Sequence, residues 1–174
     1  MHEDQSFVTF TRANYTSLFR TALLLTGGAE AAEDLVQETL TRLYPSWWRV
    51  EAADVPLAYV RRSLTNRFLT SRRRKSSGEL VLAAVPDAPA RHDATDDVVN
   101  REFEVQLMKH LSQRQRAAIV MRFFHDLDDA AIAASIGCKA VTVRSLISRA
   151  LLAMKVESDR MEGALRGARV GSTS

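Results

Sequence analysis

A short helix, a turn with glycine and a longer helix form the sequence pattern that most constrains the fold of this chain. The apolar spacing predicts the short helix over residues 129–136 and the longer one over 139–155. Gly137 and Cys138 lie between them and supply the turn. This order of elements is typical of a helix-turn-helix.

Capping residues and one apolar stripe support this interpretation. Ser112 followed by Gln115 has the spacing of a capping box. It predicts a further helix that starts at this point, ahead of the two helices of the helix-turn-helix. Asp128 can cap the short helix. Side chains from both helices can pack together along a stripe made of Ala131, Ile132, Ile136, Val143 and Ile147, which Ala150 and Met154 continue.

The opposite face of the longer helix carries groups that can donate to phosphates and base edges. These residues are Lys139, Thr142, Arg144, Ser145, Ser148 and Arg149. No acidic residue lies between Asp129 and Glu157. Because a carboxylate near a phosphate adds repulsion, this face favours contact with duplex DNA. The alternative is a plain helical hairpin whose basic face is solvated.

The first part of the chain also has helical spacing, with helices predicted over 7–25, 29–44 and 56–75. Gly27 and Gly28 end the first helix, and Pro56 opens the third. The chain has only 7 Gly and 4 Pro among 174 residues, which leaves little material for a turn-rich β fold. Residues 46–50 have a loop-like composition.

The third predicted helix is basic, and aromatic residues precede it. Arginines can neutralise phosphates, aromatic rings can stack on unpaired bases, and an amide can read a base edge. The sequence therefore predicts a platform for single-stranded DNA, made of Trp47, Trp48, Arg49, Arg61, Arg62, Asn66 and Arg67. The alternative for each tryptophan is a core position at a helix junction.

The sign of the charge changes along the chain and suggests two units. Residues 56–78 contain seven basic residues and no acid, and residues 79–104 contain seven acids. The second stretch includes two prolines without periodicity, which is typical of a linker. We therefore predict an all-α fold of two small helical domains, the second a helix-turn-helix. Their expected bounds are 1–77 and 98–157, with a flexible acidic linker over 78–97 and a disordered tail over 158–174.

Several classes of protein have little support in this sequence. Cys138 is the single cysteine, so a disulfide framework or a zinc site is not expected. The four histidines have no metal-ligand spacing, and we find no nucleophile–base pair or phosphate-binding glycine loop. We expect no cofactor, no metal and no catalysis. The N-terminus lacks a signal or membrane segment, so we expect a cytoplasmic protein without membrane insertion.

These motifs together resemble the extracytoplasmic-function sigma factors, the smallest members of the sigma-70 class of bacterial RNA polymerase subunits. The likeness is greatest to the actinobacterial sigma-E-like subgroup, which has tryptophans at a similar place. Residues 32–40, with the sequence AEDLVQETL, resemble the helix of this family that binds core polymerase. The resemblance implies that the polymerase contact includes Asp34, Leu35, Gln37, Glu38 and Arg42. It also implies that residues 56–75 recognise and help to melt the minus-ten promoter element.

Residues 111–154 resemble the region of the family that binds the minus-thirty-five element as duplex DNA. The resemblance adds Arg116, Arg122 and Ala140 to the DNA-binding residues derived above. Three positions differ from the family pattern: Lys139 replaces a common serine, Val141 a usual glycine and Leu146 a common basic residue. The implied partners are the β and β′ subunits of core RNA polymerase, promoter DNA and an anti-sigma factor.

We therefore predict a sigma factor that binds core polymerase and directs promoter recognition and transcription initiation. The alternative is a helix-turn-helix transcriptional regulator whose N-terminal helices dimerise or sense a signal. Such a regulator would bind duplex DNA without polymerase. A scaffold without a DNA role would bind its partner independently of salt, because phosphate contacts weaken steeply as salt rises.

Overall fold

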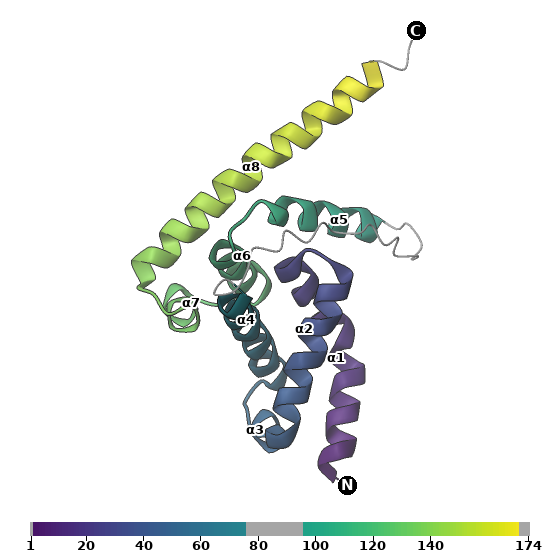
Figure 1. The fold of residues 1–174 in the computed structure, drawn as a ribbon, viewed down its shortest axis with the longest axis vertical. Helices are drawn as coiled ribbons and strands as arrows, with labels where there is room; N and C mark the ends of the chain where they lie inside the picture. Colours follow the sequence, from purple (N-terminus) through teal and green to yellow (C-terminus); the bar gives the residue numbers. More distant parts are fainter. Residues whose placement is uncertain (1, 76–95, 171–174) are drawn as a thin grey trace.

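The structure is a computed structural model that describes residues 2–75 and 96–170 (Figure 1). Every regular element in these two ranges is helical, as the sequence predicts. The elements are α1 (His2–Thr26), α2 (Ala29–Leu43), the 3₁₀ turn η1 (Tyr44–Ser46), α3 (Trp47–Glu51), α4 (Pro56–Lys75), α5 (Asp96–Lys109), α6 (Gln113–Ile119), the π-helical turn η2 (Val120–Phe124), α7 (Asp129–Ile136) and α8 (Ala140–Val170). We call α1–α4 the N-terminal unit and α5–α8 the C-terminal unit.

The N-terminal unit is a bundle in which α1 packs against both α2 and α4. Leu18, Ala22 and Leu25 are fully buried on one face of α1, at the spacing of a helical stripe. Gly27 ends α1 with a φ of +81°, and its N–H donates to the carbonyl of Leu23 at 2.8 Å. A residue with a side chain would be strained in this left-handed conformation.

The segment after α2 is helical, and the loop-like assignment of residues 46–50 is wrong. Residues 47–51 form the short helix α3, and Trp47 on that helix is only 2% exposed. Its ring meets those of Phe7 and Phe10 edge-on, with centroids 4.9 and 5.1 Å apart. Aromatic packing of this kind orders the segment, because it buries a large apolar area that a loop would leave exposed.

The helix-turn-helix has the predicted caps and core. Ser112 and Gln115 form a complete capping box at the start of α6. The carboxylate of Asp128 accepts the N–H of Ala131 at 2.8 Å at the start of α7. Gly137 ends α7 in the left-handed conformation, with φ of +72°. The buried cluster between α7 and α8 includes Ile132, Ile136 and Val143, with Ile147 packed against it, as the apolar stripe predicts.

The two units share one hydrophobic core. A single cluster of buried residues contains Leu18 and Leu25 from α1 together with Met108 from α5 and Ala117 from α6. In Figure 1, α5 and α6 lie beside the upper end of the N-terminal bundle. The predicted linker over 78–97 falls almost entirely outside the described residues, and α5 begins within its last two positions.

Helix α8 is much longer than expected, and the predicted disorder of the tail is wrong for residues 158–170. The helix runs to Val170 and extends away from the other helices (Figure 1). Gly163 and Gly167 suggest an end to the helix in the sequence. Once a helix is nucleated, however, adding a residue costs little. The side chain of Glu157 also pairs with Arg160 at 3.7 Å and with His110, the residue that follows α5, at 3.4 Å.

The two adjacent tryptophans should differ sharply in their contribution to stability. We expect Trp47→Ala to lower the free energy of unfolding by about 3–5 kcal/mol, because it leaves a cavity in the core. Trp48, which is 55% exposed, is the matched control. Trp48→Ala should change the value by less than about 0.5 kcal/mol. Urea denaturation followed by circular dichroism measures both, and equal losses would contradict the assignment.

Candidate polymerase and nucleic-acid interfaces

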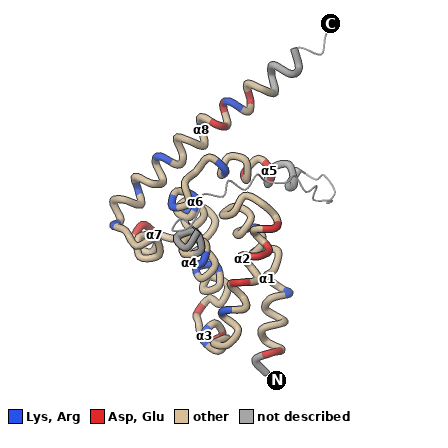
Figure 2. The backbone as a smooth tube through the Cα atoms, in the orientation of Figure 1, with Lys and Arg blue, Asp and Glu red and all other residues tan. Residues whose placement is uncertain are grey.

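The exposed side of α2 carries a shallow, open hollow. Its lining residues are Asp34, Gln37, Glu38, Thr41 and Arg42, four of which the sequence predicts as polymerase contacts. The fifth predicted residue, Leu35, is 6% exposed and belongs to the core. Leu35 is therefore a packing residue that keeps α2 in place and does not form part of this surface. Figure 2 shows acidic residues on α2 and basic ones along α4.

The basic residues of α4 differ in how accessible their charges are. Arg62 is exposed, whereas Arg61 is partly buried and donates to Ser17 Oγ at 2.5 Å. Burial lowers the pKa of Arg61, although an arginine stays charged at neutral pH. Arg67 forms an ion pair with Glu38 of the α2 hollow, so its charge is already compensated. Asn66 is half-buried, and its Oδ1 has no hydrogen-bond partner among the described residues.

The aromatic part of the predicted single-strand platform consists of one exposed tryptophan. Trp48 is exposed, and the guanidinium of Arg49 lies 5.1 Å from the centre of its ring. Such a cation–π pair offers a flat surface and a positive charge side by side. Trp47 cannot present its ring to a base in this arrangement, because the core encloses it. The alternative interpretation, a core tryptophan at a helix junction, holds for Trp47.

The predicted duplex-binding face of α8 is open to solvent. Its exposed members are Lys139, Thr142, Arg144, Ser148 and Arg149, and Ala140 and Ser145 are half-buried. This face begins at the first turn of α8 and lies opposite the stripe that packs on α7. The geometry places several hydrogen-bond donors where the recognition helix of a helix-turn-helix meets base edges.

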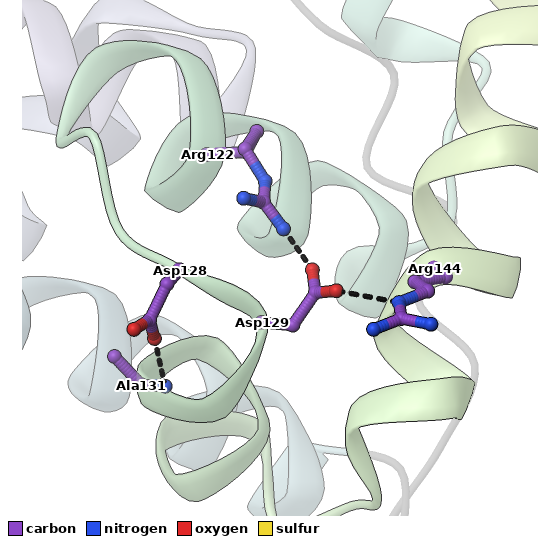
Figure 3. Close-up of polar contacts among 5 residues, drawn as sticks. All are labelled: Arg122, Asp128, Asp129, Ala131 and Arg144. Carbon is purple, nitrogen blue, oxygen red and sulfur yellow. Dashed lines mark hydrogen bonds and ion pairs between the residues drawn. The ribbon is translucent and has the colours of Figure 1, made fainter.

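An ion-pair chain holds the start of α8 against its neighbours (Figure 3). Asp129, the first residue of α7, pairs with Arg122 of η2 through Oδ1 and accepts Nε of Arg144 on α8 through Oδ2 at 2.7 Å. The hydrogen bond from Arg144 and the two positive charges hold the pKa of Asp129 below its usual range. Arg122 therefore acts first as an anchor for Asp129.

The role of Asp129 does not follow from the sequence pattern. An acid at the first position of a short helix suggests only a favourable helix dipole. Its two arginine partners lie 7 residues before it and 15 residues after it, so only the tertiary fold brings the three together. The signal that could have found Asp129 is its place as the last acid before a long acid-free stretch.

Arg116, which the sequence predicts as a DNA contact, is buried inside the protein in this structure. The side chain is 7% exposed and donates to three main-chain carbonyls. Nη1 bonds to Leu25 at 2.7 Å, and Nη2 bonds to Lys109 and Leu111 at 3.3 Å each. Leu25 is near the C-terminal end of α1, and Lys109 ends α5. A cation at this point satisfies carbonyls that the helices leave unpaired.

Other polar contacts join the two units around Arg116. Arg20 of α1 pairs with Glu104 of α5 at 3.2 Å. Gln113 of α6 donates to the carbonyl of Phe68 on α4 at 2.5 Å. His125 lies against α1, with Nε2 3.5 Å from Thr21 Oγ1. We call this set, including Arg116, the interdomain contact.

The position of His125 in this contact changes its acidity. Burial, and secondarily the charge of Arg61, lowers the pKa of His125 to about 4. The neutral ring is therefore the form that fits between α1 and α4. Burying a charged ring is costly, and no negative group in the described part of the chain acts on the pKa of His125 to offset this cost.

No group of three His, Cys, Asp or Glu residues within residues 2–75 and 96–170 could hold a metal ion. In the same ranges, no individual helix is both long and apolar enough to cross a membrane. Helices α7 and α8 are long and apolar enough only when taken together, and they are bent by 94° relative to each other.

Comparison with known proteins identifies both units. Residues 10–78 match the family model for sigma-70 region 2, and residues 105–154 match the model for sigma-70, region 4. The chain is 30% identical to the RNA polymerase sigma-E factor of Streptomyces coelicolor over 157 residues, covering 90% of this chain and 88% of that protein. It is 30% identical to the sigma-E factor of Streptomyces antibioticus, covering 87% and 83%.

A longer relative and a solved structure extend the comparison. The chain is 34% identical to the ECF RNA polymerase sigma factor SigG of Mycobacterium tuberculosis over 78% of this chain, but spans only 45% of that protein. The sigma factor RpoE of Bartonella quintana, solved in complex with the anti-sigma factor NepR, superposes with a TM-score of 0.64. That match has 25% identity and covers 87% of this chain and 95% of the other.

Loss of the Arg116 guanidinium should loosen the interdomain contact. We expect Arg116→Met to lower the free energy of unfolding by about 2–3 kcal/mol, because buried carbonyls lose a charged donor. The radius of gyration from small-angle X-ray scattering should also rise. Arg114→Met is the matched control, since Arg114 donates to the Ile136 carbonyl within the C-terminal unit. A destabilised Arg116→Met protein of unchanged radius would contradict the interdomain role.

Acid should weaken the same contact through His125. The pKa is about 4 in the folded protein and 6.5 for an exposed histidine, so the stabilisation is complete above pH 6.5. It is lost as the pH falls from 6.5 towards 4. Between pH 7.5 and 5, wild type should lose about 2 kcal/mol more unfolding free energy than His125→Gln. Urea titrations at both pH values measure this, with His110→Gln, on an exposed histidine, expected to behave as wild type.

Proposed function

The chain belongs to the extracytoplasmic-function group of sigma-70 class sigma factors, and from this premise we propose which of its surfaces perform promoter recognition and transcription initiation. The α2 hollow binds core RNA polymerase. The exposed face of α8 binds the upstream promoter element as duplex DNA. The exposed side of α4, with Trp48 and Arg49, binds the melted strand of the downstream element.

The observation that carries this proposal is the division of each helix between core and solvent. On α2 and α8, one face packs in the core, and most of the polar residues at the predicted positions on the other face stay exposed. The interdomain contact does not cover these polar faces. It uses Arg116 of α6 and the part of α4 around Phe68. Both surfaces therefore remain accessible while the two units are in contact.

The α2 hollow suits a protein partner better than a nucleic acid. Asp34 and Glu38 place carboxylates beside Gln37, and negative charges repel phosphates. Arg42 at the far edge can pair with an acidic residue of the polymerase. Since Glu38 also pairs with Arg67, docking at this hollow is physically connected to the α4 helix.

The start of α8 supplies the duplex contacts in this proposal. Lys139 and Arg149 can neutralise phosphates, and Thr142 and Ser145 can bond to base edges. Arg144 keeps its guanidinium in a fixed place because Asp129 binds its Nε. A guanidinium fixed in advance loses less entropy when it binds guanine.

The downstream contacts rest on a smaller set of residues than the sequence suggests. Arg62 offers an exposed charge, whereas the Oδ1 of Asn66 is buried without a partner among the described residues and can reach a base only after the side chain turns outward. Trp48 can stack on an unpaired base, which contributes about 1–3 kcal/mol per base. Such stacking offsets part of the cost of unpairing, which is a few kcal/mol per base.

Regulation by an anti-sigma factor is a further part of the proposal. The Bartonella quintana neighbour was solved with the anti-sigma factor NepR, and it matches this chain across both units. An anti-sigma protein that binds here would have to cover the α2 hollow or one of the DNA faces. We propose that the protein acts in the cytoplasm, where polymerase and chromosomal DNA are found, and that it has no catalytic activity of its own.

The α2 hollow should be essential for holoenzyme formation. We expect Asp34→Ala combined with Gln37→Ala to weaken binding to core RNA polymerase at least tenfold, because two polar contacts at the centre of the surface are lost. Glu30→Ala, which removes an exposed acid from the same helix outside the hollow, should bind as wild type. Fluorescence anisotropy with labelled protein and core enzyme measures both affinities.

Transcription provides the readout that separates this function from others. Core polymerase with wild-type protein should give run-off transcripts from a genomic promoter pool, and the start sites define the two promoter elements. The double variant should give none. A protein that binds duplex DNA alone and never associates with core enzyme would instead be a helix-turn-helix regulator, and the proposal would be wrong.

A further inference from the structure

Val141 is the most exposed large apolar side chain in the described part of the protein, at 67%. It lies in the first turn of α8, since the carbonyl of Lys139 accepts the N–H groups of Thr142 and Val143. The first turn of a recognition helix is the part that reaches base edges. An apolar residue at this point therefore needs a physical explanation.

The side chain of Val141 points away from the protein core. Val143 is fully buried, and a separation of two residues turns the helix by about 200°. Val141 therefore shares the opposite face with Ser145 and Ser148, which follow at four and seven residues. Its neighbours on the first turn are the exposed residues Lys139 and Thr142. Val141 is thus one apolar group within a polar and basic surface.

This placement offers no gain to the isolated protein. Valine has a lower helix propensity than alanine, and its methyl groups contact water here. An apolar residue that is exposed in this way is expected where a binding partner covers it. The basic surroundings favour DNA as that partner. The acid nearest to Val141 along the chain, Asp129, is already paired with two arginines.

We propose that Val141 reads the C5-methyl group of one thymine in the major groove of the upstream promoter element, an inference that rests on the proposed function of α8. Thymine is the one base of DNA that presents a methyl group in this groove. Contact between this methyl and those of Val141 removes both from water. Cytosine at the same place offers only a hydrogen, and the adenine amino group would lose its bond to water.

The ion-pair chain gives this contact its positional precision. Arg122, Asp129 and Arg144 fix the first turn of α8 relative to α7 and η2. Val141 is three residues before Arg144, so both project from the same end of the helix. A methyl contact discriminates between bases only when the helix cannot shift along the groove.

The test uses uracil, which pairs as thymine does and lacks only the methyl group. Holoenzyme made with wild-type protein is bound to promoter duplexes in which each thymine of the upstream element, on either strand, is replaced singly by deoxyuridine. We expect one position at which uracil weakens binding about fourfold. This is the factor for one buried methyl group, ~0.8 kcal/mol.

Two variants assign that position to its reader. Holoenzyme with Val141→Ala should bind the thymine duplex about fourfold more weakly, and uracil at the sensitive position should cause no further loss. Leu152→Ala is the matched control. Leu152 is 64% exposed on the same side of α8, about 16 Å further along the axis, and its replacement should leave the uracil effect intact.

The outcomes separate this inference from the function on which it rests. Failure to form a holoenzyme or to recognise any promoter would overturn the proposed function. Normal promoter binding with no uracil-sensitive position overturns only the role of Val141. An upstream element without an A·T pair would also overturn only the role of Val141. So would a sensitive position at which the uracil effect is the same with Val141→Ala as with wild type.

Discussion

The guanidinium of Arg116 is the constraint around which the two units are arranged. Carbonyls near the C-terminal ends of α1 and α5, and in the turn before α6, all point at this one buried cation. A helix end leaves its last carbonyls without partners, and burying them unpaired would be costly. One planar group with several donors satisfies carbonyls from both units at once. The partial negative charges of two helix ends face the cation.

This arrangement explains why the cores of the units merge while their functional faces stay separate. Met108 and Ala117 of the C-terminal unit join the same buried cluster as Leu18 of α1. The packing buries one side of each helix and leaves the polar residues of the other side outside. Ion pairs then fix the functional helices to one another. Glu38 and Arg67 join α2 to α4, and Asp129 joins η2, α7 and α8 through its two arginines.

Sequence reasoning captured the elements whose signals are local. The capping box at Ser112, the cap at Asp128 and the turn at Gly137 each depend on a few neighbouring residues, and each is present as predicted. Burial of large or charged residues was harder to predict, because periodicity does not say which helices meet. Leu35 is predicted at a surface and belongs to the core, and for Trp47 the alternative of a core position holds.

Distant partners account for the remaining errors. Arg116 binds the carbonyl of a residue 91 positions away, and its sequence context resembles that of an exposed basic residue. The length of α8 was underestimated because its glycines suggested an end. A helix that starts in a packed core can continue through such residues, and contacts such as Glu157 with His110 hold it to the turn after α5.

The same contacts change how the basic residues should be counted. On sequence alone, Arg61, Arg67, Arg116 and Arg122 are equivalent to Arg62 and Arg149 as phosphate ligands. In the structure, the first four bind a hydroxyl, carboxylates or carbonyls within the protein. The salt dependence of DNA affinity reflects the number of phosphates that the protein neutralises. Because arginines bound within the protein are not free to neutralise phosphates, this number should be smaller than the composition suggests. Positive charge in this protein therefore organises the fold first, and only the exposed remainder can bind DNA.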